Sequence, residues 1–284
     1  MDRQLVYPGQ IPLDSDILAL QRNVMVGLSA SDKAVFGAAV FDGLSVIPST
    51  PTSMVVQVLA GALWSFVPID TSAYGTLASD GRSILKQGIS LDTVPLTLTA
   101  PSTSGHAQNY LIQAGFSETD DTPVVLPYYN STNPAQPYSG PGNSGATQYT
   151  ARRCKLVIQA KPGASATSGT QVTPSADAGF VPVAVVTVAQ GQTAITSGNI
   201  VAHIDAPSIY KKLPELPAWV QSGTWAYAID TGSANAMTVT LTPKLRAISA
   251  GFHCRVRKSA AANTGAMTVT VDGFGRSEEH TSEL

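Results

Sequence analysis

Apolar and polar residues alternate along many short stretches of this chain, which is the pattern of β-strands with one buried face. The alternation predicts strands at 54–59, 63–67, 84–91, 94–99, 109–116, 155–160, 181–189 and 199–203. Turn signals such as Asp42-Gly43 and Asp80-Gly81 separate them. The strand at 94–99 contains Pro95, which has no N–H for a ladder, so we expect it at a sheet edge.

One segment near the N-terminus has a helical period instead. Its apolar positions are spaced by three and four residues, which puts them on one face of a helix: Ile17, Leu20, Val24 and Leu28. Asp14 or Asp16 is expected to cap its start. Gly27 and two nearby serines weaken the pattern, so one helix to about residue 39 and two shorter helices are both possible. The face either packs on a sheet or acts as an attachment and assembly helix.

A compact β unit is predicted at 251–275, where two alternating runs flank a polar turn and Asp272-Gly273 ends the second run. Residues 233–241 (SANAMTVTL) are echoed by 263–271 (NTGAMTVTV), an offset of thirty residues. Two copies predict either two antiparallel strands of one small sheet or two stacked modules of a fibre.

The same C-terminal unit resembles the short β units of bacteriophage tail fibres. The matching residues are Gly251, Val256, Arg257, Lys258, Ala260, Ala262, Asn263, Thr264, Gly265, Ala266, Thr268, Val271, Gly273 and Gly275. The resemblance implies an elongated homotrimer that binds phage tail or baseplate proteins through its N-terminal part. It also implies a structural virion component for attachment and host-surface recognition, made in the host cytoplasm and found in the virion.

These patterns divide the chain into five parts. We expect an arm and helix at 1–42, an antiparallel β-sandwich at 43–205, a proline-rich linker at 206–218, a small β domain at 219–275 and a tail at 276–284. The expected fold class is therefore mainly β, with an N-terminal helix, a sandwich and small β units of an elongated fibre.

The tail, RSEEHTSEL, is abruptly more charged than the rest of the chain. It back-translates in frame as AGATCGGAAGAGCACACGTCTGAACTC, which matches the start of a widely used sequencing adapter. We therefore interpret the tail as artefactual and expect the native C-terminal part to be missing.

Composition and charge exclude some partners. Only 13% of residues are charged and the formal net charge is -2, so no basic field is available to hold nucleic acid through its phosphates. Arg255, Arg257 and Lys258 form the longest basic cluster, which the alternation puts on a solvent face. No apolar run approaches the ~18 residues of a membrane span, so membrane insertion is not expected, and the N-terminus lacks the pattern of a signal peptide.

Catalytic and metal signals are weak. Cys154 and Cys254 each lie in a strand-like run and are expected to be small buried side chains rather than a disulfide. The acidic group at 118–121, followed by Pro123, is interpreted as a solvated turn rather than a calcium loop. The glycine-rich 140–145 lacks the strand and helix that a nucleotide loop needs. We therefore predict no cofactor, no metal and no enzymatic activity.

The longest segment without periodicity, 128–150, is the best binding candidate. It contains four tyrosines, whose rings can stack on sugars: Tyr128, Tyr129, Tyr138 and Tyr149. These rings either bind a bacterial surface glycan or pack the loop onto its own sheet. The alternative function is accordingly a carbohydrate-binding module or a polysaccharide depolymerase.

Overall fold

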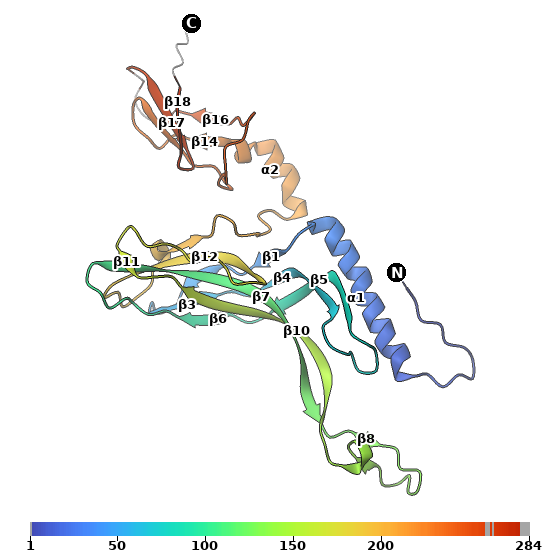
Figure 1. The fold of residues 1–284 in the computed structure, drawn as a ribbon. Helices are drawn as coiled ribbons and strands as arrows, with labels where there is room; N and C mark the ends of the chain where they lie inside the picture. Colours follow the sequence, from blue (N-terminus) through green and yellow to red (C-terminus); the bar gives the residue numbers. More distant parts are fainter. Residues whose placement is uncertain (1, 259–261, 263, 279–284) are drawn as a thin grey trace. The chain divides into compact units, whose positions relative to one another are not determined.

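The computed structural model describes residues 2–258, 262 and 264–278. The chain forms two compact units, Met1–Ser208 and Ile209–Leu284 (Figure 1). The boundary falls within the predicted linker, but the second half of that linker is not extended, because its last residues enter helix α2 (Leu216–Ser222). Within the described residues, no helix is both long and apolar enough to cross a membrane.

The first unit combines one long helix with a larger sheet, a smaller three-stranded sheet and a separate two-stranded sheet. Its elements are α1 (Asp14–Phe36), β1 (Val40–Gly43), β2 (Val46–Pro48), β3 (Val55–Val58), β4 (Gly61–Asp70), β5 (Asp80–Ser90), β6 (Val94–Thr97), β7 (His106–Val124), β8 (Pro127–Tyr128), β9 (Tyr138–Ser139), β10 (Gln148–Pro162), β11 (Ala166–Thr167), β12 (Phe180–Ala189) and β13 (Ile200–Ala202).

The larger sheet has the strand order β1-β4-β5-β10-β7-β12-β13, with β11 also paired to β7, and the smaller sheet has the order β2-β3-β6. The core contains side chains of both sheets, among them Val56 and Val58 of β3 and Ile112 and Val186 of the larger sheet. The mainly β class with an N-terminal helix is thus confirmed, and β6 with its proline lies at a sheet edge as predicted. One pair departs from the antiparallel expectation, since β5 and β10 are parallel.

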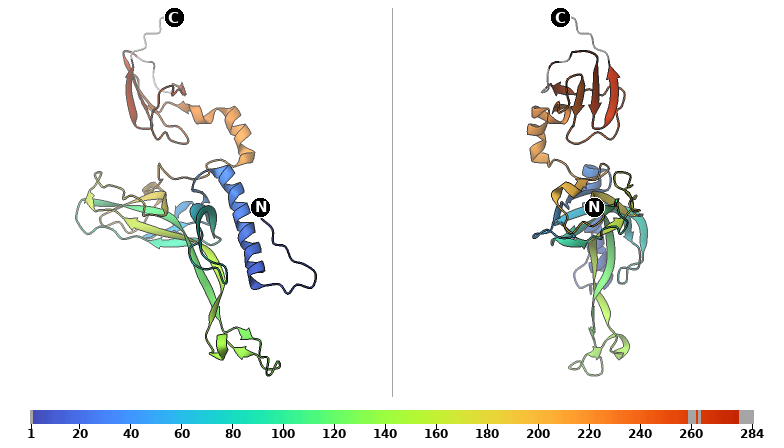
Figure 2. Two further views of the ribbon diagram at one scale, coloured as in Figure 1. Left: turned by 45° about the vertical axis from the view of Figure 1, so that its right-hand side comes forward. Right: turned by 90° about the vertical axis from the view of Figure 1, so that its left-hand side faces the viewer.

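Strands β7 and β10 form a hairpin that runs beyond the rest of the first unit (Figure 2). Both strands are longer than the alternation predicted. The acidic residues expected in a turn lie in β7 instead, where Asp120 is opposite Arg152 and Glu118 is opposite Cys154. The turn prediction was wrong because cross-strand charge pairs, which a single strand's sequence does not show, stabilise the extended stem. Asp80-Gly81 likewise begins β5 rather than forming a turn.

Helix α1 is a single helix. Its start is fixed by Asp16, whose Oδ2 accepts the Leu13 N–H at 2.9 Å, and its end by Gly37, whose φ of 69° is left-handed. The expected division at residue 42 does not separate α1 from the sandwich. The helix is in the same compact unit, and β1 begins at Val40.

The second unit contains the two repeat copies. Its strands are β14 (Tyr227–Ile229), β15 (Ala236–Val239), β16 (Arg255–Arg257), β17 (Met267–Val271) and β18 (Phe274–Glu278). Strand β14 pairs with β16 and β15 pairs with β17, both in parallel. Strands β15 and β17 belong to the first and second copy, so the copies pair side by side in parallel and the antiparallel alternative was wrong.

The stacked copies enclose a small core that includes Ala228, Val239, Leu241 and Val271. Strands β17 and β18 form an antiparallel hairpin whose turn residues, Asp272 and Gly273, both have positive φ, as the Asp-Gly signal predicted. Two motif residues of the tail-fibre resemblance, Ala260 and Asn263, lie outside the described residues, as does the tail from residue 279.

Candidate assembly surface

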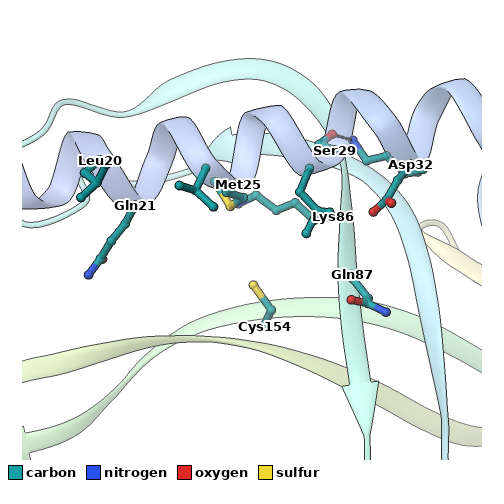
Figure 3. Close-up of a pocket in the computed structure, with 11 residues that line it drawn as sticks. Leu20, Gln21, Met25, Ser29, Asp32, Lys86, Gln87 and Cys154 are labelled. Carbon is teal, nitrogen blue, oxygen red and sulfur yellow. Dashed lines mark hydrogen bonds between the residues drawn. The ribbon is translucent and has the colours of Figure 1, made fainter. Parts of the chain in front are cut away.

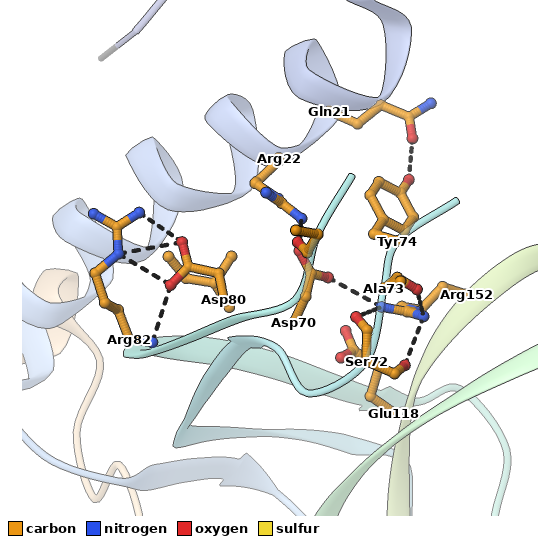
Figure 4. A network of polar contacts seen from close by, with 12 residues as sticks. Gln21, Arg22, Asp70, Ser72, Ala73, Tyr74, Asp80, Arg82, Glu118 and Arg152 are labelled. Atoms are coloured by element: carbon orange, nitrogen blue, oxygen red, sulfur yellow. Dashed lines mark hydrogen bonds and ion pairs between the residues drawn. The ribbon is translucent and has the colours of Figure 1, made fainter. Parts of the chain in front are cut away.

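The charged side chains in the middle and last turns of α1 face the sheet. Arg22 Nη2 lies 2.7 Å from Asp70 Oδ2 and also donates to the carbonyl of Ala78 (Figure 4). Asp32 accepts the indole N–H of Trp64 at 3.1 Å, and the Lys33 ammonium lies 5.8 Å from the centre of the Phe66 ring. Helix α1 thus binds its own sheet through polar side chains as well as through Phe36, whose ring centre lies 4.9 Å from that of Trp64.

The outward face of α1 is apolar. The four predicted stripe residues are each between 51% and 58% exposed, and Val35 continues their spacing at 76%. At about 100° per residue, positions 17, 20, 24, 28 and 35 fall within an arc of roughly 80°. The prediction that these residues share one face is confirmed, and this face is not packed on the sheet.

A buried charge network anchors the helix and the base of the hairpin. The Arg152 guanidinium contacts Asp70 at 3.2 Å and donates to the carbonyl of Ala73 (Figure 4). It also contacts Asp120 at 2.6 Å. Lys86, whose side chain is almost fully buried, donates to Glu118 at 2.7 Å. The network was not predicted from the sequence, because its members come from strands far apart in the chain.

The network also shifts the pKa values of two of its members, Asp120 and Arg152. A hydrogen bond from the Arg152 side chain lowers the pKa of Asp120 below its ordinary value, and the pKa of Arg152 is raised in turn, chiefly by the same bond. Both groups therefore stay charged at neutral pH and keep the hairpin stem joined to the loop after β4.

A groove of about 550 Å³ runs beside the apolar stripe, beneath α1. Its walls come from the helix and from β5 and β10: Leu20, Val24, Leu28, Leu85, Gln87 and Cys154 (Figure 3). The groove exists because β5 and β10 splay apart, since their only register pair is Lys155 with Ile89. The stripe and the groove together form one continuous surface, which we call the α1 surface.

Cys154 was expected to be buried, but it is an exposed residue whose thiol faces this groove. Although the residue as a whole is exposed, the groove walls remove part of the water around its sulfur. This partial desolvation, together with the carboxylate of Glu118 at 3.6 Å from Sγ, raises the pKa of the thiol to about 11. The alternation in β10 was a poor guide because the helix covers only part of this face. Cys254 is half-buried in the second unit, and both thiols are free.

The four predicted tyrosines do not form one site. Tyr128 and Tyr138 are opposite each other in β8 and β9 at the hairpin tip, and the Tyr128 hydroxyl bonds Gln148. Tyr129 is 78% exposed. Tyr149 instead lines a depression near the base of the hairpin with Tyr74 and Leu18. The tip therefore keeps three of the tyrosines, and the fourth belongs to the α1 side of the stem.

Other candidate chemistry is limited. Among the described residues, no group of three or more His, Cys, Asp or Glu side chains could hold a metal ion. The glycine-rich segment forms a short 3-10 turn, Pro141–Asn143, at the hairpin tip. Comparisons with family models, curated proteins and solved structures found no match.

Proposed function

We propose that this chain is a structural component of a phage virion, similar to a tail fibre, which self-associates through the α1 surface. The observation that carries the proposal is the exposed apolar stripe of α1: Arg22 and Asp32 bind the sheet while the stripe stays uncovered. Exposing that much apolar side chain on a helix is unfavourable unless another surface covers it.

Identical copies are the occupant that the stripe fits best. In a cyclic homo-oligomer each copy presents the same residues, so a charged stripe would place like charges close together. The stripe from Ile17 to Val35 has no charged side chain. We therefore propose a homotrimer, with the N-terminal part also docking on tail or baseplate proteins.

The second unit and the hairpin fit the same function. The two repeat copies pair in parallel, and Asn235 of the first copy accepts the Thr264 N–H of the second at 2.7 Å. The β7–β10 hairpin carries exposed tyrosines at its tip, where they can contact a host-surface glycan. In this proposal neither part performs covalent chemistry.

The experiment that tests self-association compares two variants by size-exclusion chromatography with light scattering. Leu20→Glu combined with Val24→Glu puts charges on the stripe and should convert the oligomer to a monomer. Leu91→Glu is the control, because Leu91 is 85% exposed but lies after β5, away from the helix. A monomeric wild-type chain at micromolar concentration would contradict the proposal.

The rival function is a carbohydrate-binding module or a depolymerase, and the exposed Tyr129 favours its binding part. Incubation with host capsular polysaccharide separates the two. Binding without release of oligosaccharide supports the structural role, whereas release that depends on carboxylate side chains would support the depolymerase.

A further inference from the structure

The groove beneath α1 is bordered by a strand edge with little pairing. Strand β5 pairs with β4 along its length, but towards β10 its one register partner is Lys155, opposite Ile89. Gly88 lies at the fork, the point where β5 and β10 separate. The two strands are so close there that a Cβ at Gly88 would lie 3.1 Å from the carbonyl oxygen of Lys155. Beyond the fork, the Leu85 N–H donates to the hydroxyl of Ser29 on α1 at 2.7 Å. The edge of β5 is therefore held by α1 at Leu85, and the groove beside it has apolar walls against which an extended segment can pack.

The N-terminal arm is an extended segment of suitable composition. Residues 2–13 contain no helix or strand apart from a turn at Pro8-Gly9, closed by the Gln10 N–H donating to the carbonyl of Tyr7 at 3.0 Å. Its apolar side chains Leu5, Val6, Tyr7 and Ile11 are between 51% and 83% exposed. Both the arm and the groove therefore leave apolar surface uncovered in the single chain.

The arm is held on one flank of the apolar stripe. Gln4 Nε2 donates to Asp16 Oδ1 at 2.8 Å. At about 100° per residue, Asp16 lies roughly 100° to one side of Ile17. Gln21, which lines the groove, lies about 40° to the other side. In a ring of parallel helices this flank meets the groove flank of the next copy.

We propose that the arm of one copy inserts into the α1 groove of the neighbouring copy, where its apolar side chains pack against the groove walls. This inference rests on the proposed self-association. The groove follows α1 from Leu20 to Asp32, about 18 Å at 1.5 Å per residue. Five or six extended residues at ~3.3 Å each fill that length, so Arg3 to Tyr7 occupy the groove. Residues 8–13 then provide a tether of about 20 Å between copies.

The native Cys154 provides the test, since its thiol faces the groove. In a Cys254→Ser background, Leu5→Cys is oxidised with copper phenanthroline and run on a non-reducing gel. We expect intermolecular disulfides that give dimer and closed-trimer bands. Gln10→Cys, in the arm's turn, should give at least about tenfold less product, and Leu5→Cys with Cys154→Ser should give none. All the changed arm positions are exposed, and circular dichroism checks that the variants fold.

The outcomes separate this proposal from the function it rests on. Disulfide within one chain, seen as a faster monomer band, would overturn arm exchange in favour of docking on the same copy. An oligomer by light scattering without any disulfide would overturn arm exchange but leave self-association in place. A monomer would overturn both. As a second measurement, deletion of residues 2–12 should raise the concentration at which the oligomer dissociates by about tenfold or more.

Discussion

The buried charge network predicts a large loss of stability when its central carboxylate is neutralised. Asp70 is 3% exposed and lies between two guanidinium groups, 2.7 Å from Arg22 and 3.2 Å from Arg152. Asp70→Asn keeps the shape of the side chain but leaves the two cations close together with no carboxylate between them. Removing one partner of a buried pair costs about 3–5 kcal/mol.

Two features of the structure place the expected loss at the lower end of that range. Arg152 keeps its contact with Asp120 at 2.6 Å, and the Arg22 side chain is 19% exposed, so water can solvate part of its charge. We therefore expect Asp70→Asn to lower the free energy of unfolding of the first unit by about 3 kcal/mol. Urea denaturation followed by far-UV circular dichroism measures this loss.

The matched control is Asp80→Asn. Asp80 also pairs with an arginine, at 2.6 Å, but the Arg82 side chain is 82% exposed and solvent screens the pair. We expect this variant to unfold at the wild-type urea concentration. If the two variants unfold at the same concentration, the network does not anchor α1. Adding Arg22→Met to Asp70→Asn should recover part of the loss, since it removes one unpaired cation.

Three further predictions follow from other parts of the structure. Cys154 should react slowly with maleimide at pH 8, and Glu118→Gln should speed the reaction, because removing the nearby negative charge lowers the thiol pKa. Asp120 has a lowered pKa in the folded chain. Its charge therefore stabilises the fold above the ordinary pKa of an aspartate, and this stabilisation is lost as the pH falls through the lower pKa of the folded state. Asp120→Asn should accordingly reduce the drop in melting temperature between pH 6 and pH 3. Asn235→Gly keeps the positive φ of 59° but removes the bonds to Thr264, so the second unit should lose about 1 kcal/mol in urea denaturation.

Sequence patterns correctly predicted those elements that are determined by residues close together in the chain. The spacing of the stripe residues predicted α1. Asp272-Gly273 predicted the β17–β18 turn, because a primed turn requires residues that accept positive φ. Pro95 gave the edge strand, since a missing N–H cannot be replaced by any neighbour. The approximate repeat was visible too, but the sequence left its pairing open between antiparallel strands and stacked copies.

The elements that the sequence missed depend on partners distant in the chain. Glu118 and Asp120 looked like a polar turn before a proline, and they became strand residues because β10 places Arg152 opposite one and Cys154 opposite the other. The prediction that Cys154 is buried was also wrong, because alternation along one strand does not show which face of that strand a distant helix leaves uncovered.

The sequence by itself determined that α1 is helical with one apolar face, because side-chain spacing along a helix is a property of the segment alone. Only the tertiary structure decided which way that face points. Arg22, Ser29 and Asp32 meet Asp70, Leu85 and Trp64 across the helix–sheet contact, and these bonds turn the apolar stripe away from the core. The physical reason is that buried polar groups require partners, and those partners come from strands more than thirty residues away along the chain.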